Sequence, residues 1–370
     1  MIIIVSKSIP PEHSGSGKRM YNLFLYLRRE GYEVKYITNT PHRENEDVIV
    51  LKKHRYENHL GKLNPIVVFL HTFIKLTFRY LSGCFKSNIK VKTVWLVSAN
   101  PMTSAAGIFF YLRGYRIITQ NILMNSDDPV HCSPGLLKFN YRLKMLQYRF
   151  SDIVTCISPA LYYLSRTCHP RCTMIPNPVE IPVIKVLPKA GKKSNILVVG
   201  RLCYRKGTDI VFKVINLIHK DDPDVHVSFV GPYEDMDKKL KLLYESSQNI
   251  NKMNVHFAGY QIDTRPWYMK ADIFLMPSRR EGFGTGFIEA MAYGIPVVAK
   301  KLEGITDYIF YNGYPAVIDS EDPNEYTSII FKLMNDDGYY HSLVKELRRN
   351  VKRFDRAKIY KQYLNLLEGR

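Results

Sequence analysis

Cysteine and long apolar runs are both scarce in this sequence. Six scattered cysteines in 370 residues are too few for a disulfide framework, which favours a reducing compartment. The longest apolar stretch, Pro65–Leu81, is interrupted by His71, Lys75 and Arg79, so it does not predict a membrane-spanning helix. No signal peptide precedes the first predicted strand, Ile2–Ser6. We therefore expect a globular, cytoplasmic protein.

Clear metal-binding patterns are missing as well. Cys168, His169 and Cys172 stand close together, but no second ligand pair follows at a zinc-like spacing. No Asp-x-Asp pair stands directly at a predicted strand end. The adjacent pairs Asp127-Asp128 and Asp221-Asp222 fall in predicted turns and are interpreted as surface. We therefore expect no metal site.

Acidic side chains are outnumbered by basic ones, 34 against 53, which gives a net charge of +19. The excess is uneven, since the stretch from Leu51 to Pro170 holds 16 Lys and Arg against 4 Asp and Glu. Such a basic half favours an anionic partner, either a membrane surface, a lipid-linked acceptor or a nucleic acid. The sequence contains no helix-turn-helix, finger or RNA-binding signature, so nucleic acid is not expected.

The stretch Pro65–Leu81 has the composition of an apolar helix. Its basic side chains recur every four residues, at His71, Lys75 and Arg79, and therefore line one side. Two interpretations stay open. The helix is either a core element with a solvated edge, or it lies in a membrane interface with its cations toward the headgroups.

Strand and helix patterns alternate along the chain, which predicts parallel, doubly wound α/β sheets. A proline-rich stretch, Pro176 to Pro188, is the clearest linker. We predict a Rossmann-like, acceptor-binding domain over residues 1–182 and a second Rossmann-like domain over residues 183–354. A last helix, within residues 355–370, is expected to pack back on the first domain. Tandem domains of this kind bind nucleotides between the carboxyl ends of their sheets.

The most informative stretch is Asp272 to Lys300. A short buried strand, Asp272–Pro277, leads into a glycine-rich turn, Gly282–Gly286, and then into a helix that Gly294 ends. Glu281 and Glu289 lie on either side of the turn. The simpler interpretation is a buried strand unit with two solvated glutamates. The alternative is a phosphate cradle at a helix N-terminus, with carboxylates that hold sugar hydroxyls.

Two cations follow the first strand of the second half, Ile196–Val199. Arg201 and Lys206 sit at its strand-to-helix turn, where positive charge would neutralise a diphosphate. An isolated Arg and Lys in a loop are more often solvated surface. Their position relative to Glu281 and Glu289 favours the functional interpretation.

Together these motifs resemble those of the retaining glycosyltransferases of family 4. The specific part is the Glu281-Gly-Phe-Gly motif with Glu289-Ala-Met-Ala and Gly294-Ile-Pro-Val-Val, preceded by Gly200-Arg201 and Lys206-Gly207. Looser matches are Ser14-Gly-Ser-Gly after the first strand, Asp152 to Ser158, and Ile175-Pro-Asn-Pro before the linker. The resemblance spans nearly the whole chain.

The resemblance implies a GT-B fold, two Rossmann-like domains that face each other across a cleft, and a nucleotide diphosphate sugar as donor. It implies that Arg201 and Lys206 contact the diphosphate, that Glu281 binds the transferred sugar, and that Glu289 binds the ribose. The family looks metal-independent, and no cofactor is expected.

Main-chain groups complete the implied donor site. Amides of Phe283, Gly284 and Thr285 would cradle phosphate and sugar. The turn Gly15, Ser16 and Gly17 would approach the diphosphate from the first domain, and the main chain near Gly259 and Tyr260 would meet the base.

One position departs from the family, in which a histidine often follows the strand that matches Arg116–Gln120. This chain has Asn121 after Gln120, and an amide hydrogen-bonds but does not act as a base. We assign Asn121 as a catalytic candidate, alongside Arg201, Lys206 and Glu281. His13 and His131 are possible replacements for the missing ring. A reaction in which the departing phosphate takes the acceptor proton needs no strong protein base.

The predicted function is a metal-independent hexosyltransferase that retains configuration, with a lipid-linked glycan or other acceptor at the inner face of a membrane. Two alternatives stay open: a sugar-nucleotide epimerase of the same fold, or a non-catalytic nucleotide-sugar-binding homologue. A dehydrogenase is disfavoured, because no Gly-rich dinucleotide fingerprint with a later acidic residue follows either first strand.

Overall fold

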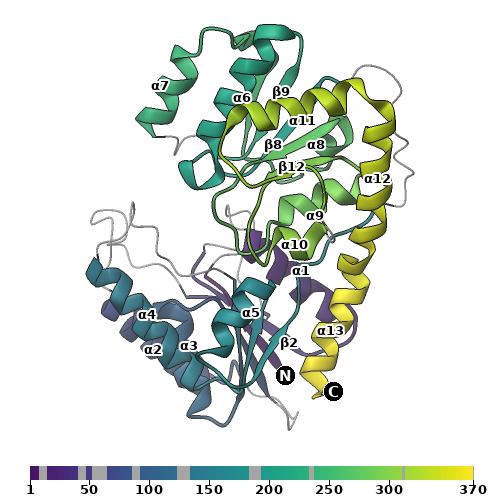
Figure 1. Cartoon of the computed structure of the whole chain (residues 1–370). Helices are drawn as coiled ribbons and strands as arrows, with labels where there is room; N and C mark the ends of the chain where they lie inside the picture. The colour runs from purple at the N-terminus through teal and green to yellow at the C-terminus, as the bar shows by residue number, and fades with distance from the viewer. Residues whose placement is uncertain are drawn as a thin grey trace. The chain divides into compact units, whose positions relative to one another are not determined.

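The computed structural model describes residues 1–7, 15–40, 47–51, 65–85, 92–122, 134–182, 193–232, 237–310 and 313–369. The chain divides into two compact units, coloured mainly purple to teal and teal to yellow in Figure 1. The first consists of Met1–Pro176 with Tyr363–Arg370, and the second of Asn177–Gln362. The division falls after Pro176 rather than after Pro182, because Asn177 and Val179 already form their hydrogen bonds within the second unit.

The first unit is built on a seven-stranded parallel sheet, in the order β3-β2-β1-β4-β5-β6-β7. Its strands are short runs rich in Val, Ile and Thr, buried almost throughout, as expected for a parallel sheet that is covered on both faces. The order reverses between β1 and β4, which makes the sheet doubly wound. The strands are β1 (Ile2–Val5), β2 (Val34–Thr38), β3 (Val48–Val50), β4 (Thr93–Val97), β5 (Arg116–Asn121), β6 (Ile153–Cys156) and β7 (Cys172–Met174).

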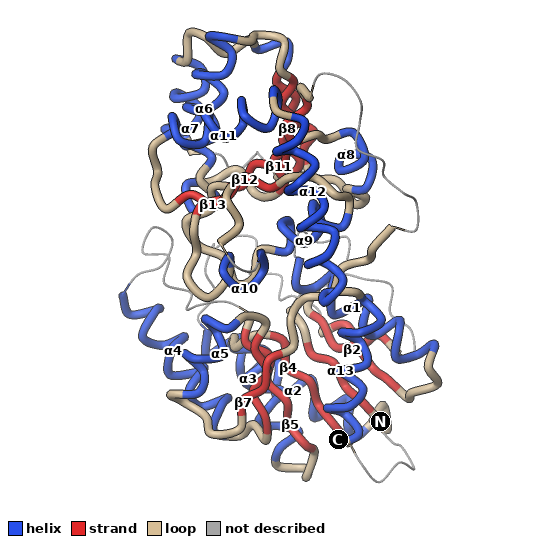
Figure 2. Tube along the Cα trace, turned by 45° about the vertical axis from the view of Figure 1, so that its right-hand side comes forward, coloured by secondary structure: helices blue, strands red, loops and turns tan. Residues whose placement is uncertain are grey.

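Helices cover both faces of this sheet (Figure 2). Side chains of a strand alternate between faces, so Val94 and Leu96 join the core that includes Leu76 of α2 and Phe109 of α3, whereas Trp95 lies on the other face. The predicted turn at Gly15 to Gly17 is wrong, because these residues are the first residues of helix α1. The helices are α1 (Gly15–Arg29), α2 (Pro65–Leu81), α3 (Pro101–Tyr111), α4 (Pro134–Arg149) and α5 (Pro159–Arg166).

The second unit repeats this plan with a six-stranded parallel sheet, in the order β10-β9-β8-β11-β12-β13. Its order reverses between β8 and β11. The predicted strand Tyr314–Ile318 is shorter than expected, since only its last two residues pair. The strands are β8 (Asn195–Val199), β9 (His226–Val230), β10 (Val255–Gly259), β11 (Ile273–Met276), β12 (Val297–Lys300) and β13 (Val317–Ile318).

Helices and short 3-10 turns surround the second sheet. They are η2 (Tyr204–Lys206), α6 (Thr208–Asp221), α7 (Lys238–Ser246), η3 (Lys252–Asn254), α8 (Arg265–Lys270), α9 (Thr285–Ala292), α10 (Thr306–Phe310), α11 (Pro323–Asn335), α12 (Asp337–Val351) and η4 (Lys352–Phe354). The prediction of two doubly wound α/β domains is confirmed.

The last helix, α13 (Arg356–Glu368), begins in the second unit and ends in the first. Tyr363 is fully buried there, with its ring centroid 5.1 Å from that of Trp95. Gln120 Nε2 donates to the Tyr363 hydroxyl at 3.0 Å, and Arg116 Nη1 donates to the Leu366 carbonyl at 3.0 Å. The core of the first unit is therefore completed by residues from the far end of the sequence.

We expect Tyr363→Ala to lower the free energy of unfolding of the first unit by about 3–5 kcal/mol, because it removes a buried aromatic ring. Tyr363→Phe should cost about 1–2 kcal/mol, since it keeps the ring and removes the hydroxyl that accepts from the Gln120 amide. Denaturant unfolding followed by Trp fluorescence measures both. The control is Tyr32→Phe, which removes an exposed hydrogen bond to Glu368. Equal losses for the control and Tyr363→Ala would contradict this packing role.

Candidate functional site

Two loops of the second unit meet where its strand order reverses. β8 and β11 are neighbours, and each is followed at its carboxyl end by one of the loops that the sequence singled out. The loop after β8 leads through η2 into α6, and the loop after β11 leads into α9. In doubly wound sheets, ligands bind beyond the carboxyl ends of the strands, at the point where the strand order reverses.

The backbones of the two loops approach each other at Gly207. This residue has φ +71°, and a Cβ placed on it would lie 2.1 Å from the Pro277 carbonyl oxygen. No side chain fits at that distance, so glycine is required for both reasons. The approach brings η2 directly beside the segment that follows β11.

Lys206 and Glu281 form an ion pair across these loops, with Nζ 2.5 Å from Oε1. Their side chains are only 20% and 9% exposed. Partial burial strengthens the attraction relative to a surface pair, and each charge would be costly to leave alone there. Arg201, which follows β8 by two residues, is exposed at the same end of the sheet.

The glycine turn forms the N-terminus of α9. Gly284 is its N-cap with φ +84°, and Thr285 is the first helical residue. The first amides of a helix have no partner within it, and the helix dipole adds partial positive charge there. Asn177 supports the turn, because its Nδ2 donates to Thr285 Oγ1 at 2.9 Å. The ring of Phe283 is buried against Phe354, with centroids 5.6 Å apart.

Glu289 is oriented by a buried tyrosine. The Tyr268 hydroxyl donates to Glu289 Oε2 at 2.8 Å, and the Tyr268 ring stacks on Tyr293 with centroids 5.5 Å apart. Burial first, and then the Glu289 charge, raise the pKa of Tyr268 well above its usual value. The hydroxyl therefore stays protonated and fixes one carboxylate oxygen.

An ion-pair network is centred on Arg279, in the loop after β11. Arg279 makes a bidentate ion pair with Asp209 of α6 and a second ion pair with Glu321, which also accepts from Lys300. Hydrogen bonds from Arg279, and then from Lys300, outweigh partial burial and lower the pKa of Glu321 to about 2.

The remaining predicted site residues lie elsewhere. Gly259 ends β10 and Tyr260 follows it, on the β9 side of the same sheet. Gly15, Ser16 and Gly17 belong to the first unit, and so does Asn121. Asn121 ends β5, is buried, and donates from Nδ2 to Ser165 Oγ at 2.9 Å. His13 and His131 lie outside the described residues.

The structure thus brings Arg201, Lys206, Glu281, Phe283, Gly284 and Thr285 to one end of the second sheet, with Glu289 in the helix that follows. The sequence did not predict the supporting roles of three residues, Asn177, Tyr268 and Arg279. Only Asn177 had a signal, because it belongs to the Ile175-Pro-Asn-Pro match.

Comparison with known proteins identifies this part of the chain. Residues 193–336 match the sequence profile of the family described as "Glycosyl transferases group 1". This part of the chain is thus similar in sequence to the group 1 glycosyltransferases. A lipopolysaccharide core biosynthesis glycosyltransferase, LpsE of Rhizobium meliloti, is 27% identical over 176 residues, which are 47% of this chain and 50% of LpsE. The chain thus spans about half the length of this curated relative.

Solved structures match the fold of the whole chain. Sucrose-phosphate synthase from Thermosynechococcus elongatus superposes with a TM-score of 0.76 at 20% identity, covering 100% of this chain and 98% of that one. Anabaena HepE, solved with UDP and glucose, superposes with a TM-score of 0.70 at 18% identity, covering 99% of both chains. The fold of the chain is therefore the GT-B fold, which confirms the expected fold class.

The lowered pKa of Glu321 predicts a pH-dependent contribution to stability. A carboxyl whose folded pKa is about 2, against an ordinary value of 4.5, stabilises the fold fully above about pH 5. That contribution is lost as the pH falls from 4.5 toward 2. We therefore expect Glu321→Gln to be less stable than the wild type at pH 7 and equally stable near pH 2, measured by denaturant unfolding. Glu325→Gln on α11 is the control. A difference for Glu321→Gln that does not change with pH would contradict the ion pair.

Proposed function

We propose that this protein is a retaining hexosyltransferase that moves a sugar from a nucleotide diphosphate donor to an acceptor hydroxyl. The observation that carries the proposal is the Lys206–Glu281 pair beside the N-terminus of α9, at the reversal of strand order. A cation, a carboxylate and helix amides are the groups that a sugar diphosphate requires. The UDP and glucose held by HepE support the donor class.

The chemistry follows from where charge develops. Breaking the bond between sugar and diphosphate builds negative charge on the leaving group, and Lys206, Arg201 and the α9 amides would oppose it without a metal ion. When a donor binds, Lys206 would exchange its Glu281 partner for phosphate oxygens. Glu281 would then accept hydrogen bonds from sugar hydroxyls, while Glu289, held by Tyr268, would bind the ribose.

The departing phosphate would take the acceptor proton, so the transfer needs no strong protein base. Asn121 has its amide committed to Ser165 and would act, if at all, as a hydrogen-bonding group. Two rival functions remain to be separated. An epimerase would convert a sugar nucleotide with no acceptor present, whereas a non-catalytic homologue would bind the sugar nucleotide and release no nucleotide.

The donor-site assignment predicts that Glu289→Ala and Lys206→Ala abolish transfer while the protein stays folded. A loss of at least about a hundredfold in kcat/KM is expected for each, because charge-assisted contacts to the donor disappear. A nucleotide-release screen over common sugar nucleotides identifies the donor and measures the loss. The controls are Lys213→Ala, an exposed lysine on α6, and Glu325→Ala. Unchanged turnover in both site variants would refute the assignment.

We further propose that the acceptor is lipid-linked or lies at a membrane surface, and that α2 is the docking element. One side of α2 presents five apolar residues at spacings of three and four, with exposures from 44% at Val67 to 76% at Leu81; they are Val67, Leu70, Ile74, Phe78 and Leu81. We call this set the α2 stripe. The opposite side of the helix, with Thr72 and Leu76, is buried in the unit.

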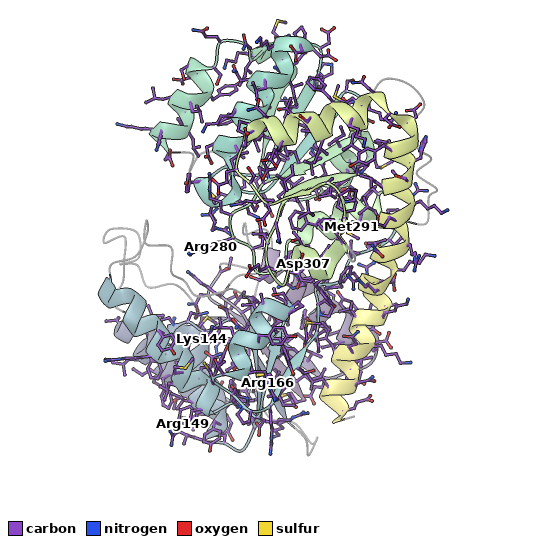
Figure 3. The ribbon with its side chains drawn as sticks, viewed as in Figure 1. Lys144, Arg149, Arg166, Arg280, Met291 and Asp307 are labelled. Atoms are coloured by element: carbon purple, nitrogen blue, oxygen red, sulfur yellow. The ribbon has the colours of Figure 1, made fainter. Side chains whose placement is uncertain are left out.

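Cations border the α2 stripe. His71, Lys75 and Arg79 fall on the adjoining side of the helix. The same unit also carries Lys144 and Arg149 on α4, labelled in Figure 3. An apolar strip edged by positive charge matches an anionic bilayer surface, where each cation contributes about 1 kcal/mol. No helix among the described residues is long and apolar enough to cross a membrane. The name of the relative LpsE is consistent with a lipid-linked acceptor.

We expect the protein to sediment with anionic vesicles at low salt, and to be released by raising the salt, because ionic screening weakens the cationic contribution. Phe78→Glu combined with Ile74→Glu should reduce binding by at least about tenfold, since each change places a charge in the apolar boundary. The matched control is Leu242→Glu, which alters an equally exposed leucine on α7 of the second unit. Equal binding by stripe and control variants would refute docking through α2.

A further inference from the structure

Arg279 uses all five of its guanidinium N–H groups within the second unit. Nη1 donates to the Tyr204 carbonyl and to Asp209 Oδ1, each at 2.7 Å. Nη2 donates to Asp209 Oδ2 at 2.8 Å and to Glu321 Oε2 at 2.7 Å, and Nε donates to Glu321 Oε1 at 3.0 Å. The guanidinium also lies 3.7 Å from the centroid of the Tyr204 ring.

These contacts join the two loops that hold the candidate site. Tyr204 is the first residue of η2 and Lys206 its last, while Arg279 lies two residues before Glu281. The Arg279 N–H donates to the Arg205 carbonyl at 2.9 Å, which adds a backbone link between the same segments. Arg279 therefore links the two segments that contain Lys206 and Glu281.

Arg279 itself has no donor left for a ligand. Its side chain is only 15% exposed, and its charge is matched by two carboxylates. A residue so committed affects the reaction through the residues it holds. The planar guanidinium of Arg279 can pair with a carboxylate through two hydrogen bonds and contact a carbonyl at the same time. A lysine ammonium lacks this geometry.

We propose that Arg279 is a positioning residue that holds Lys206 in place beside Glu281 for the donor diphosphate. The role toward the diphosphate rests on the proposed function, whereas the role toward the Lys206–Glu281 pair does not. Loss of the Arg279 guanidinium would let η2 separate from the loop after β11, and the Lys206 ammonium would become exposed.

The first test measures the Lys206 ammonium without any substrate. The full-length protein is treated with a limiting amine-acylating reagent, and Lys206 labelling is quantified by peptide mass spectrometry. We expect Arg279→Lys to raise the labelling rate of Lys206 about fivefold or more, because exposure and loss of an ion partner both make the amine accessible. Lys213 serves as the internal reference.

The matched control is Arg265→Lys, which alters an exposed bidentate pair with Asp263 that belongs to neither loop. This control should leave Lys206 labelling unchanged. If Arg279→Lys fails to fold, Asp209→Asn is assayed in the same way, since it removes the negative charge and one of the two carboxylate oxygens that accept from Arg279. Unchanged Lys206 labelling in a folded variant overturns the proposal.

The second test uses UDP and GDP as probes of the diphosphate site, titrated by calorimetry. Arg279→Lys should weaken binding of the preferred nucleotide about tenfold, a change of roughly 1.4 kcal/mol. The double variant Lys206→Ala with Arg279→Lys should bind no more weakly than Lys206→Ala alone, because Arg279 acts through Lys206. Additive losses would overturn the proposal. Failure of the wild type to bind either nucleotide would count against the proposed function, and the labelling result would still decide the role of Arg279.

Discussion

At Gly207 the loop after β8 runs so close to the Pro277 backbone that no side chain fits between them. The approach places a cation and a carboxylate from distant parts of the sequence within 2.5 Å of each other. It also brings Arg279 within reach of η2 and α6. Without it, the two loops would be separate surface turns of a parallel sheet.

Charge in this region forms two networks. In one, the Arg279 charge is matched by Asp209 and Glu321, so that cation serves the fold. In the other network, Lys206 is paired with Glu281, a partner that a donor could replace, and Arg201 is exposed at the same end of the sheet. A network that is already satisfied can hold its geometry while the Lys206–Glu281 pair exchanges partners.

Some of this could be predicted from the sequence, and some could not. Local patterns predicted the bounds of α2 correctly and those of β11 to within one residue at each end, because periodicity and buried runs act over a few residues. The grouping of Arg201 and Lys206 with Glu281 needed the motif spacing as well. The partners of Arg279 could not be predicted, because Asp209 lies 70 residues away in the sequence. The sequence also does not distinguish an arginine that joins two loops from one that is exposed to solvent.

The first unit illustrates a different limit. Helical periodicity predicted α2, yet two interpretations of its basic side chains stayed open, because periodicity does not say which side faces the core. The structure buries Thr72 and Leu76 and exposes the α2 stripe. Similarly, a proline-rich composition marked the linker, whereas the division between the units follows the hydrogen bonds of Asn177 and Val179.

The burial of Tyr363 against Trp95 has a consequence for how the chain is made. On the ribosome, every strand of the first sheet emerges before the second unit, but the helix that covers Trp95 emerges after it. The part of the first sheet that α13 covers, with Trp95 and Gln120, therefore stays uncovered by that helix while the second unit is synthesised. The two units are nested in sequence, and a fragment that stops at the linker would carry an unfinished core.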